Sequence, residues 1–291
     1  EYDALAGLGH ACGHHMQGPA ILGAAKALKD AAIDAPYTIT VYGTPAEETI
    51  SGKVVMLENG CTFEELDVAL MMHGGPATQV DVKSLALNKL KIIYHGVCSH
   101  AALKPEKGRS ALMAACAAAM MMQGIPRSGE GTTRIAVGRL NAGEGRNVTP
   151  VHADMQLEVR GETGEINQYM VKNVENIVEG VKRAYEVEAE IVKAGEATTL
   201  PSCPEVLDLI ESVAKTVPGV ESIERFNKPS GSEDCTLLIE RVVQHGGRGA
   251  YFLFGCNHHG HHRADFEIQD ETSLPMAFNM FKGLALRLNG I

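Results

Sequence analysis

The sequence predicts an α/β protein, in which a twisted, mostly parallel sheet flanked by helices is interrupted by an inserted ferredoxin-like α+β domain. The chain has 291 residues, more than the roughly 100–200 that one domain usually holds. Helix and strand patterns alternate near both ends, whereas the middle follows the order β-α-β-β-α-β. We therefore expect a discontinuous outer domain of residues 1–85 and 199–291, and an inserted domain of residues 86–198.

The outer domain is predicted from apolar residues at helical spacing and from short apolar strands. Residues 17–32 place Ile21, Ala25 and Leu28 on one stripe, and "YTITVYG", which begins at Tyr37, reads as a strand. The other expected elements are a helix at 53–59, a strand at 68–72, a helix after Pro204, a helix at 235–242, a strand at 249–255 and a helix from 271.

The inserted domain is predicted from strands that surround two helices. Its first helix is opened by Ser110 and ended by Gly124. The other expected elements are strands at 89–95, 133–140, 153–161 and 187–192, and an amphipathic helix at 166–185. This order is that of a ferredoxin-like split unit.

Composition narrows the class of protein. The net charge of −10 disfavours nucleic acid and anionic membrane surfaces as partners. Seven cysteines without a framework pattern indicate reduced thiols in a cytoplasmic protein. The longest apolar run, 111–122, is too short to cross a bilayer. Because the chain opens on "EYDAL", without methionine or signal peptide, we expect N-terminal residues to be absent.

Four segments of the outer domain concentrate metal-ligand residue types. They are "HACGHH", "PAEE", "MMHGGP" and "HHGHHRADF", each in a loop or just after a predicted strand. Singly, each has an ordinary explanation, such as a surface histidine, solvated charge, a small buried cysteine or an adventitious nickel-binding tract. Because strand-end loops of an α/β sheet gather at one edge, the four together predict a transition-metal site.

The adjacent glutamates of "PAEE" indicate the reaction. If Glu48 binds the metal, Glu47 points elsewhere but stays close. A metal lowers the pKa of bound water to about 7, and a neighbouring carboxylate that is not a ligand accepts its proton and passes it to a leaving amine. A structural zinc site has no need of such a carboxylate. The pair therefore favours metal-assisted hydrolysis.

Six ordered motifs carry a resemblance to a known family. They are "EYDALAGLGHACGHH", "GTPAEE", "MMHGGP", "HGVCSHAALKPEKGRSAL", "RNVTPVHADMQLEVRG" and "GSEDC". The chain resembles, over nearly its whole length, the dimetal amidohydrolases that include aminoacylases, carboxypeptidase G and the hydrolases of indole-acetyl-amino acids and p-aminobenzoyl-glutamate. The branch with a Cys-Gly-His metal motif is the most similar one. Members of the family are longer at the N-terminus.

The resemblance implies two divalent metal ions, zinc or manganese, and assigns roles to particular residues. Cys12 would bridge the metals, with His14, Glu48 and His73 as further ligands and Glu47 as general base. The last ligand would be His262, four residues before Phe266, with His261 as the alternate.

The resemblance also implies a lid and dimerisation role for the inserted domain, and hence a homodimer. His100 would stabilise the scissile carbonyl oxygen, often from the partner subunit, while Asn147 and Arg160 would lie near the substrate. His15 departs from the usual residue after Cys-Gly-His, and Ala6 replaces a common proline. His15 is therefore an alternate contact to a ligand or substrate.

Three hypotheses follow. The first is a hydrolase that cleaves the amide of N-acyl amino acids, aminobenzoyl-glutamate-like conjugates or dipeptides. The second is a non-catalytic metal-binding relative, which would have no use for Glu47. The third is a hydrolase that uses Cys12 as nucleophile, with His14 or His15 beside it, although a metal-bound thiolate is not a free nucleophile.

Overall fold

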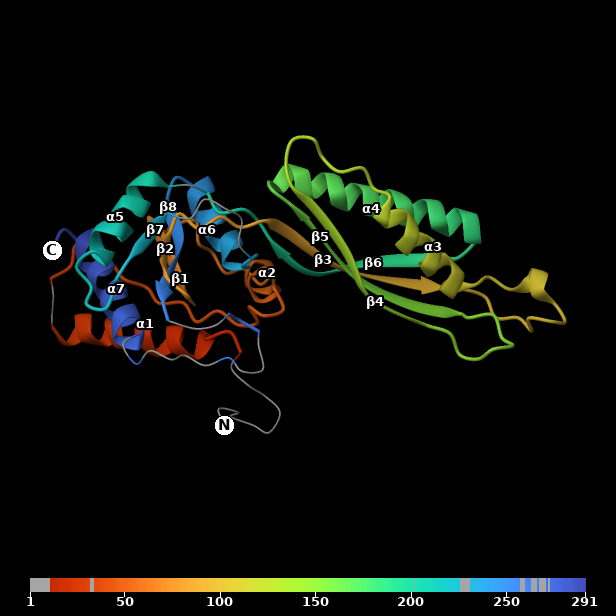
Figure 1. The fold of residues 1–291 in the computed structure, drawn as a ribbon, viewed down its shortest axis with the longest axis horizontal. Coiled ribbons are helices and arrows are strands. Elements are labelled where there is room, and N and C mark those ends of the chain that lie inside the picture. The colour runs from red at the N-terminus through yellow and green to blue at the C-terminus, as the bar shows by residue number, and fades with distance from the viewer. Residues whose placement is uncertain are drawn as a thin grey trace.

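A computed structural model of the chain describes residues 11–31, 34–201, 203–225, 231–256, 260–262, 266, 271 and 273–291. Two sheets lie one beyond the other along the long axis of the molecule, each with its own helices (Figure 1). The predicted α/β class is confirmed in this coarse form. Residues 1–10, which include Ala6 and His10, and most of "FEIQDE" lie outside the described residues.

The first sheet is mixed, which corrects the predicted mostly parallel arrangement. Its strand order is β1-β8-β2-β7, for β1 (Val68–Gly75), β8 (Arg248–Gly255), β2 (Thr78–Val80) and β7 (Ile223–Arg225). The pairs β1–β8 and β2–β7 are parallel, but β2 runs antiparallel to β8. Only Pro76 and Ala77 join β1 to β2, and so short a connection cannot make the crossover that a parallel strand requires.

Helices cover both faces of this sheet because strand β8 is apolar on both. Ala250, Phe252 and Phe254 pack with α1 (His14–Asp30), α5 (Pro204–Ala214) and α7 (Ser273–Leu288). On the other face, Tyr251 packs with α6 (Cys235–Gln244), which also contacts α2 (Gly52–Glu58). The burial of both faces is the pattern expected of a central strand in an α/β sheet.

The predicted strand at Tyr37–Tyr42 is wrong, because the segment follows an irregular path. Tyr37, Ile39 and Tyr42 are exposed, and a cleft of about 1450 Å³ separates the segment from β1. Alternation predicts an extended backbone, but a strand also needs a neighbour for its hydrogen bonds. Among the described residues, this segment has no ladder partner.

The second sheet has the predicted ferredoxin-like connectivity. Its order is β4-β5-β3-β6, for β3 (Ala86–His95), β4 (Thr133–Ala142), β5 (His152–Gly161) and β6 (Glu188–Ala197), and every pair is antiparallel. Helices α3 (Ala111–Gln123) and α4 (Gly164–Tyr185) pack on one face. As predicted, Ser110 caps α3, because its hydroxyl accepts a hydrogen bond from the Met113 amide.

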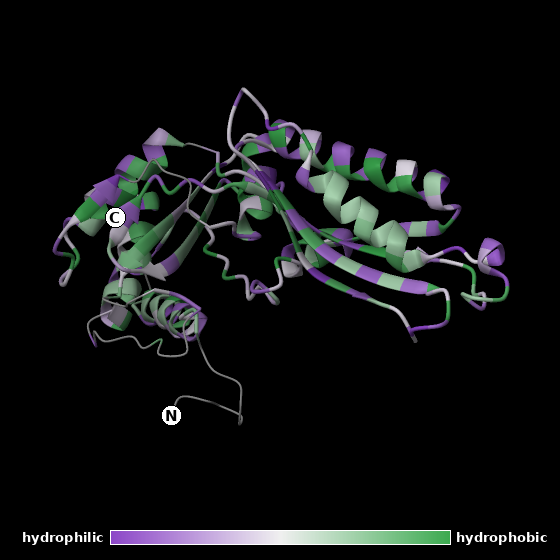
Figure 2. Cartoon of the chain, turned by 45° about the vertical axis from the view of Figure 1, so that its right-hand side comes forward, coloured by the Kyte–Doolittle hydropathy of each residue, from purple (hydrophilic) through white to green (hydrophobic). Residues whose placement is uncertain are grey.

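The strands of the second sheet alternate in hydropathy, with apolar residues toward the helices and polar residues on the open face (Figure 2). On β3, Leu90, Ile92 and Tyr94 are buried under α3 and α4. No helix in the described part of the chain is both long and apolar enough to cross a membrane.

Candidate metal centre

The first two candidate ligands are placed by the start of helix α1. Gly13 takes a left-handed backbone conformation, with φ of 89°, immediately before the helix. Glycine adopts this conformation without steric cost. The turn that results brings Cys12 and His14 toward the same point, at the carboxyl end of β1, where His73 lies.

Cys12, His14 and His73 form a compact set of donors. The distance from Cys12 Sγ to His73 Nε2 is 3.4 Å, and His73 Nε2 lies 3.0 Å from His14 Nε2. Ligand atoms about 2.0–2.3 Å from one tetrahedral ion lie roughly 3.3–3.7 Å apart, so the spacing is close to that of a metal shell. His73 Nδ1 lies 2.7 Å from the Gly74 carbonyl oxygen and donates to it, which leaves Nε2 facing the other donors.

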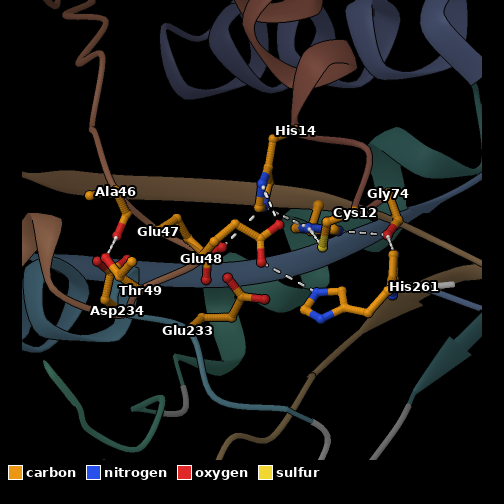
Figure 3. Close-up of polar contacts among 12 residues, drawn as sticks. Cys12, His14, Ala46, Glu47, Glu48, Thr49, Gly74, Glu233, Asp234 and His261 are labelled. Atoms are coloured by element: carbon orange, nitrogen blue, oxygen red, sulfur yellow. Dashed lines mark hydrogen bonds and ion pairs between the residues drawn. The ribbon is translucent and has the colours of Figure 1, made fainter. Parts of the chain in front are cut away.

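Glu47 and Glu48 approach His14 from the loop between residues 43 and 51. Glu47 Oε2 lies 3.2 Å from His14 Nε2, and Glu48 Oε1 lies 3.4 Å from His14 Nδ1. The Glu47 side chain is 19 % exposed and that of Glu48 is 52 % exposed. The two carboxylates therefore flank one imidazole ring, as Figure 3 shows.

Both C-terminal histidines also reach the cluster. His262 Nε2 lies 3.4 Å from Glu48 Oε2, and Cys12, Glu48 and His262 form a second donor group. His261 donates from Nε2 to the Gly74 carbonyl oxygen over 2.9 Å, and its ring meets that of His73 edge to face. Burial lowers the pKa of His261. The donor geometry therefore favours His262 over His261 as the ligand.

The charges of the cluster fit a cation. Burial raises the pKa of the Cys12 thiol far above its usual range, and the carboxylates of Glu48, Glu233 and Glu47 raise it further. A bound divalent ion reverses such a shift, because its charge favours the thiolate and the carboxylates. Three overlapping donor groups meet at this place, and Cys12 belongs to two of them, which is an arrangement suited to two ions.

Glu233 is a residue of this site to which sequence analysis gave no role, although its motif "GSEDC" was noted. Its carboxyl group shares a hydrogen bond with Glu47 and accepts another from the Tyr251 hydroxyl over 3.2 Å. Burial, followed by the charge of Glu47, raises its pKa well above the usual range. Figure 3 shows the Glu233 carboxyl group directed toward Glu47 and Glu48.

Two candidate substrate residues lie far from this cluster. Strand β3 runs from the first sheet to the outer end of the second, and the segment between β3 and α3, which contains His100, lies at that end (Figure 1). There the Ala101 amide donates to the Asn147 carbonyl over 3.1 Å. His100 Nδ1 accepts from the amides of Ala102 and Leu103 over 3.2 and 3.3 Å.

Arg160 lies at the opposite, inner end of β5. Its guanidinium group bonds to Glu158 over 2.9 Å and donates to the Ser232 hydroxyl over 3.3 Å. Ser232 adjoins Glu233, so Arg160 lies close to the donor cluster, unlike His100 and Asn147. His15 is exposed on α1, next to His14.

The fold and the donor cluster together define a metallopeptidase-type hydrolase. The chain belongs to peptidase family M20/M25/M40, whose model matches residues 3–287. The family predicted from the motifs is thereby confirmed, and with it the class of metallo-amidohydrolase at the level of the family.

Relatives agree with this assignment. A p-aminobenzoyl-glutamate hydrolase homolog of Haemophilus influenzae is 34% identical over 288 residues, covering 97% of this chain and 68% of that protein. Indole-3-acetyl-aspartic acid hydrolase of Enterobacter agglomerans is 37% identical over 279 residues, covering 93% of this chain and 64% of that protein. The chain thus spans about two thirds of the length of these relatives.

A solved structure shows the same architecture. The aminobenzoyl-glutamate utilization protein from Klebsiella pneumoniae superposes with a TM-score of 0.82 at 34% identity. The match covers 92% of this chain and 66% of that one.

Proposed function

We propose that this chain forms the metal site of an amidohydrolase that cleaves N-acyl amino acids, aminobenzoyl-glutamate-like conjugates or dipeptides. The observation that carries the proposal is the position of Glu47, a second carboxylate 3.2 Å from His14 and beside Glu48. A purely structural metal site is closed by its ligands and has no role for such a group.

The ligands in this proposal are Cys12, His14, Glu48, His73 and His262, for two divalent ions, zinc or manganese, with Cys12 shared. Thiolate, imidazole and carboxylate together admit either metal. A divalent cation held there polarises the substrate carbonyl and makes a water molecule more acidic.

The chain's own residues move the protons. Glu47 accepts a proton from the attacking water and delivers it to the amide nitrogen, so that the leaving amine departs neutral. Glu233, held by Tyr251, lies against Glu47 and keeps its carboxyl group directed into the cleft. Arg160, near Ser232, is suited to the substrate's carboxylate because guanidinium groups bind carboxylates in a bidentate manner.

His100 and Asn147 complete the site from a second copy of the chain in this proposal. They lie at the outer end of the second sheet, so one chain does not bring them to its own donor cluster. Met113, Met120 and Met121 of α3 are 52%, 75% and 50% exposed, which supports an interface on residues 86–198 acting as a lid and dimerisation domain.

A cytoplasmic location is part of the proposal. All seven cysteines are free thiols, as expected in a reducing compartment.

A substrate screen tests the function. The protein, loaded with zinc or with manganese, is assayed against N-acyl amino acids, aminobenzoyl-glutamate and dipeptides, before and after chelation, with Glu47→Gln as the matched control. We expect turnover that chelation abolishes and that metal restores. Activity that survives chelation but is lost in Cys12→Ala would indicate a cysteine nucleophile. Full metal loading without turnover on any substrate would indicate the non-catalytic relative.

A further inference from the structure

The loop that carries Glu47 and Glu48 is attached to the second sheet as well as to the first. The Glu196 amide, on edge strand β6, donates to the Ile50 carbonyl over 2.9 Å. Lys89 of β3 donates from Nζ to the Glu48 carbonyl over 3.4 Å. The second sheet therefore bonds directly to the backbone of the loop on both sides of Thr49.

Apolar packing reinforces this attachment. The Ile50 side chain is 6% exposed and forms a small buried cluster with Leu87 and Ala197, one from β3 and one from β6. The pairing of β3 with β6 shifts register between Lys89 and Leu90, next to this cluster. Bulges of this kind often lie beside active sites, where they redirect the strand.

Ile50 also holds an unusual backbone conformation, with φ of 57°. A β-branched residue rarely adopts a positive φ, and such strain persists only where the surroundings enforce it. Within the loop, the Ile50 amide donates to the Glu47 carbonyl over 2.6 Å, so the turn at Ile50 is joined to the backbone of Glu47 itself.

Gly195 provides the space for this contact. A Cβ atom added at Gly195 would lie 2.6 Å from the Ile50 carbonyl oxygen and 2.9 Å from the Thr49 carbonyl oxygen. Both are backbone atoms, which cannot turn away as a side chain can. Any larger residue would therefore displace the loop from β6.

We propose that Ile50 and Gly195 form a joint through which the second sheet fixes Glu47 and Glu48 relative to the remaining donors of the metal site. Both are positioning residues, since neither touches substrate or metal. The inference rests on the proposed function for its catalytic consequence, but the placing of Glu48 as a ligand has a consequence for metal affinity alone.

The experiment compares two strand glycines of the second sheet. Gly195→Ala inserts a methyl group into the joint, whereas Gly138→Ala, on β4, meets no atom within 4 Å. The metal-free protein is titrated with Co²⁺ and followed by visible absorption, which reports the cysteine thiolate and the coordination geometry. Thermal unfolding of the metal-free variants is measured in parallel.

We expect Gly195→Ala to weaken Co²⁺ binding about 10–100-fold, as loss of a supporting contact to a ligand commonly does, and to alter the Co²⁺ spectrum. It should lower kcat more than it changes KM. Gly138→Ala should match the wild type in all of these. Wild-type Co²⁺ affinity and spectrum in Gly195→Ala, whatever its unfolding temperature, would overturn the joint.

A second pair keeps the test decisive if Gly195→Ala does not fold. Ile50→Gly removes the side chain that packs on Leu87 and Ala197 but tolerates the positive φ, and Ile50→Val retains the contact. Weaker Co²⁺ binding in Ile50→Gly, with rescue in Ile50→Val, supports the joint, and equal binding in both overturns it. If the wild type binds Co²⁺ but hydrolyses no amide, the proposed function fails while the joint is still tested.

Discussion

The two ends of the molecule differ in how their candidate functional residues are assembled. At the inner end, donors from α1, from the loop at 43–51 and from β1 meet within one chain, with distances of 3.0–3.4 Å between Cys12, His14 and His73. At the outer end, His100 and Asn147 lie together in loops of the second sheet, exposed and far from that cluster. One chain therefore builds a metal centre but presents its remaining substrate residues to another molecule.

The largest expected effect is at the inner end. Glu47→Gln should reduce kcat by about 10²–10⁴-fold, because the amide can neither accept nor return a proton. Metal content, measured by elemental analysis, should be unchanged. Loss of metal from Glu47→Gln would make Glu47 a ligand and would remove the distinction between the two glutamates.

The buried ion pair behind the loop should matter for folding. Lys53 Nζ lies 2.8 Å from Asp234 Oδ1, and the two side chains are 2% and 0% exposed. Lys53→Met leaves a buried carboxylate without its counter-charge, which commonly costs about 3–5 kcal/mol. Denaturant unfolding would measure it. Lys91→Met, whose partner Asp154 is paired at the partly exposed surface of the second sheet, should cost less than about 1 kcal/mol.

The outer end is tested by His100→Ala, which should lower kcat about 10²–10³-fold with metal content unchanged, because one donor to the developing oxyanion is lost. Mixing this variant with Glu47→Gln under conditions of subunit exchange should restore part of the activity, since one site of a mixed dimer then has both residues. Full activity in His100→Ala alone would show that the outer end takes no part in the reaction.

A smaller effect is expected from Glu48→Gln, which should weaken metal binding about 10–100-fold rather than abolish it, because four other donors are left. Isothermal titration with Zn²⁺ and with Mn²⁺ would check this. An unchanged affinity would remove Glu48 from the ligand set and would leave His262 as the donor at that position of the inner cluster.

Most of the helices and strands could be predicted because each buries one stripe or one face. The helix expected at 166–185 is α4, Gly164–Tyr185, and the strand expected at 249–255 is β8, Arg248–Gly255. By contrast, β2 and β7 have three residues each, too few to show a period of two. The alternation at Tyr37–Tyr42 predicted an extended backbone correctly but could not supply a partner strand.

The candidate site was predictable in its residue types but not in its geometry. Four short motifs, far apart in sequence, contained the donors, since each motif follows a strand or opens a helix. The role of Glu233 depends on its contact with Glu47, and the tight approach of Gly195 to Ile50 depends on how two sheets pack. Such contacts between segments have no signature in either segment alone, so only the folded chain reveals them.

The turn that holds His100 also determines which form of its ring the protein presents. Because the amides of Ala102 and Leu103 both donate to Nδ1, that nitrogen must be bare, and the neutral ring is the tautomer with its hydrogen on Nε2. An uncharged His100 is therefore already a hydrogen-bond donor and needs no proton from solvent to become one. The backbone of an exposed loop thus sets the polarity of the imidazole before any substrate arrives.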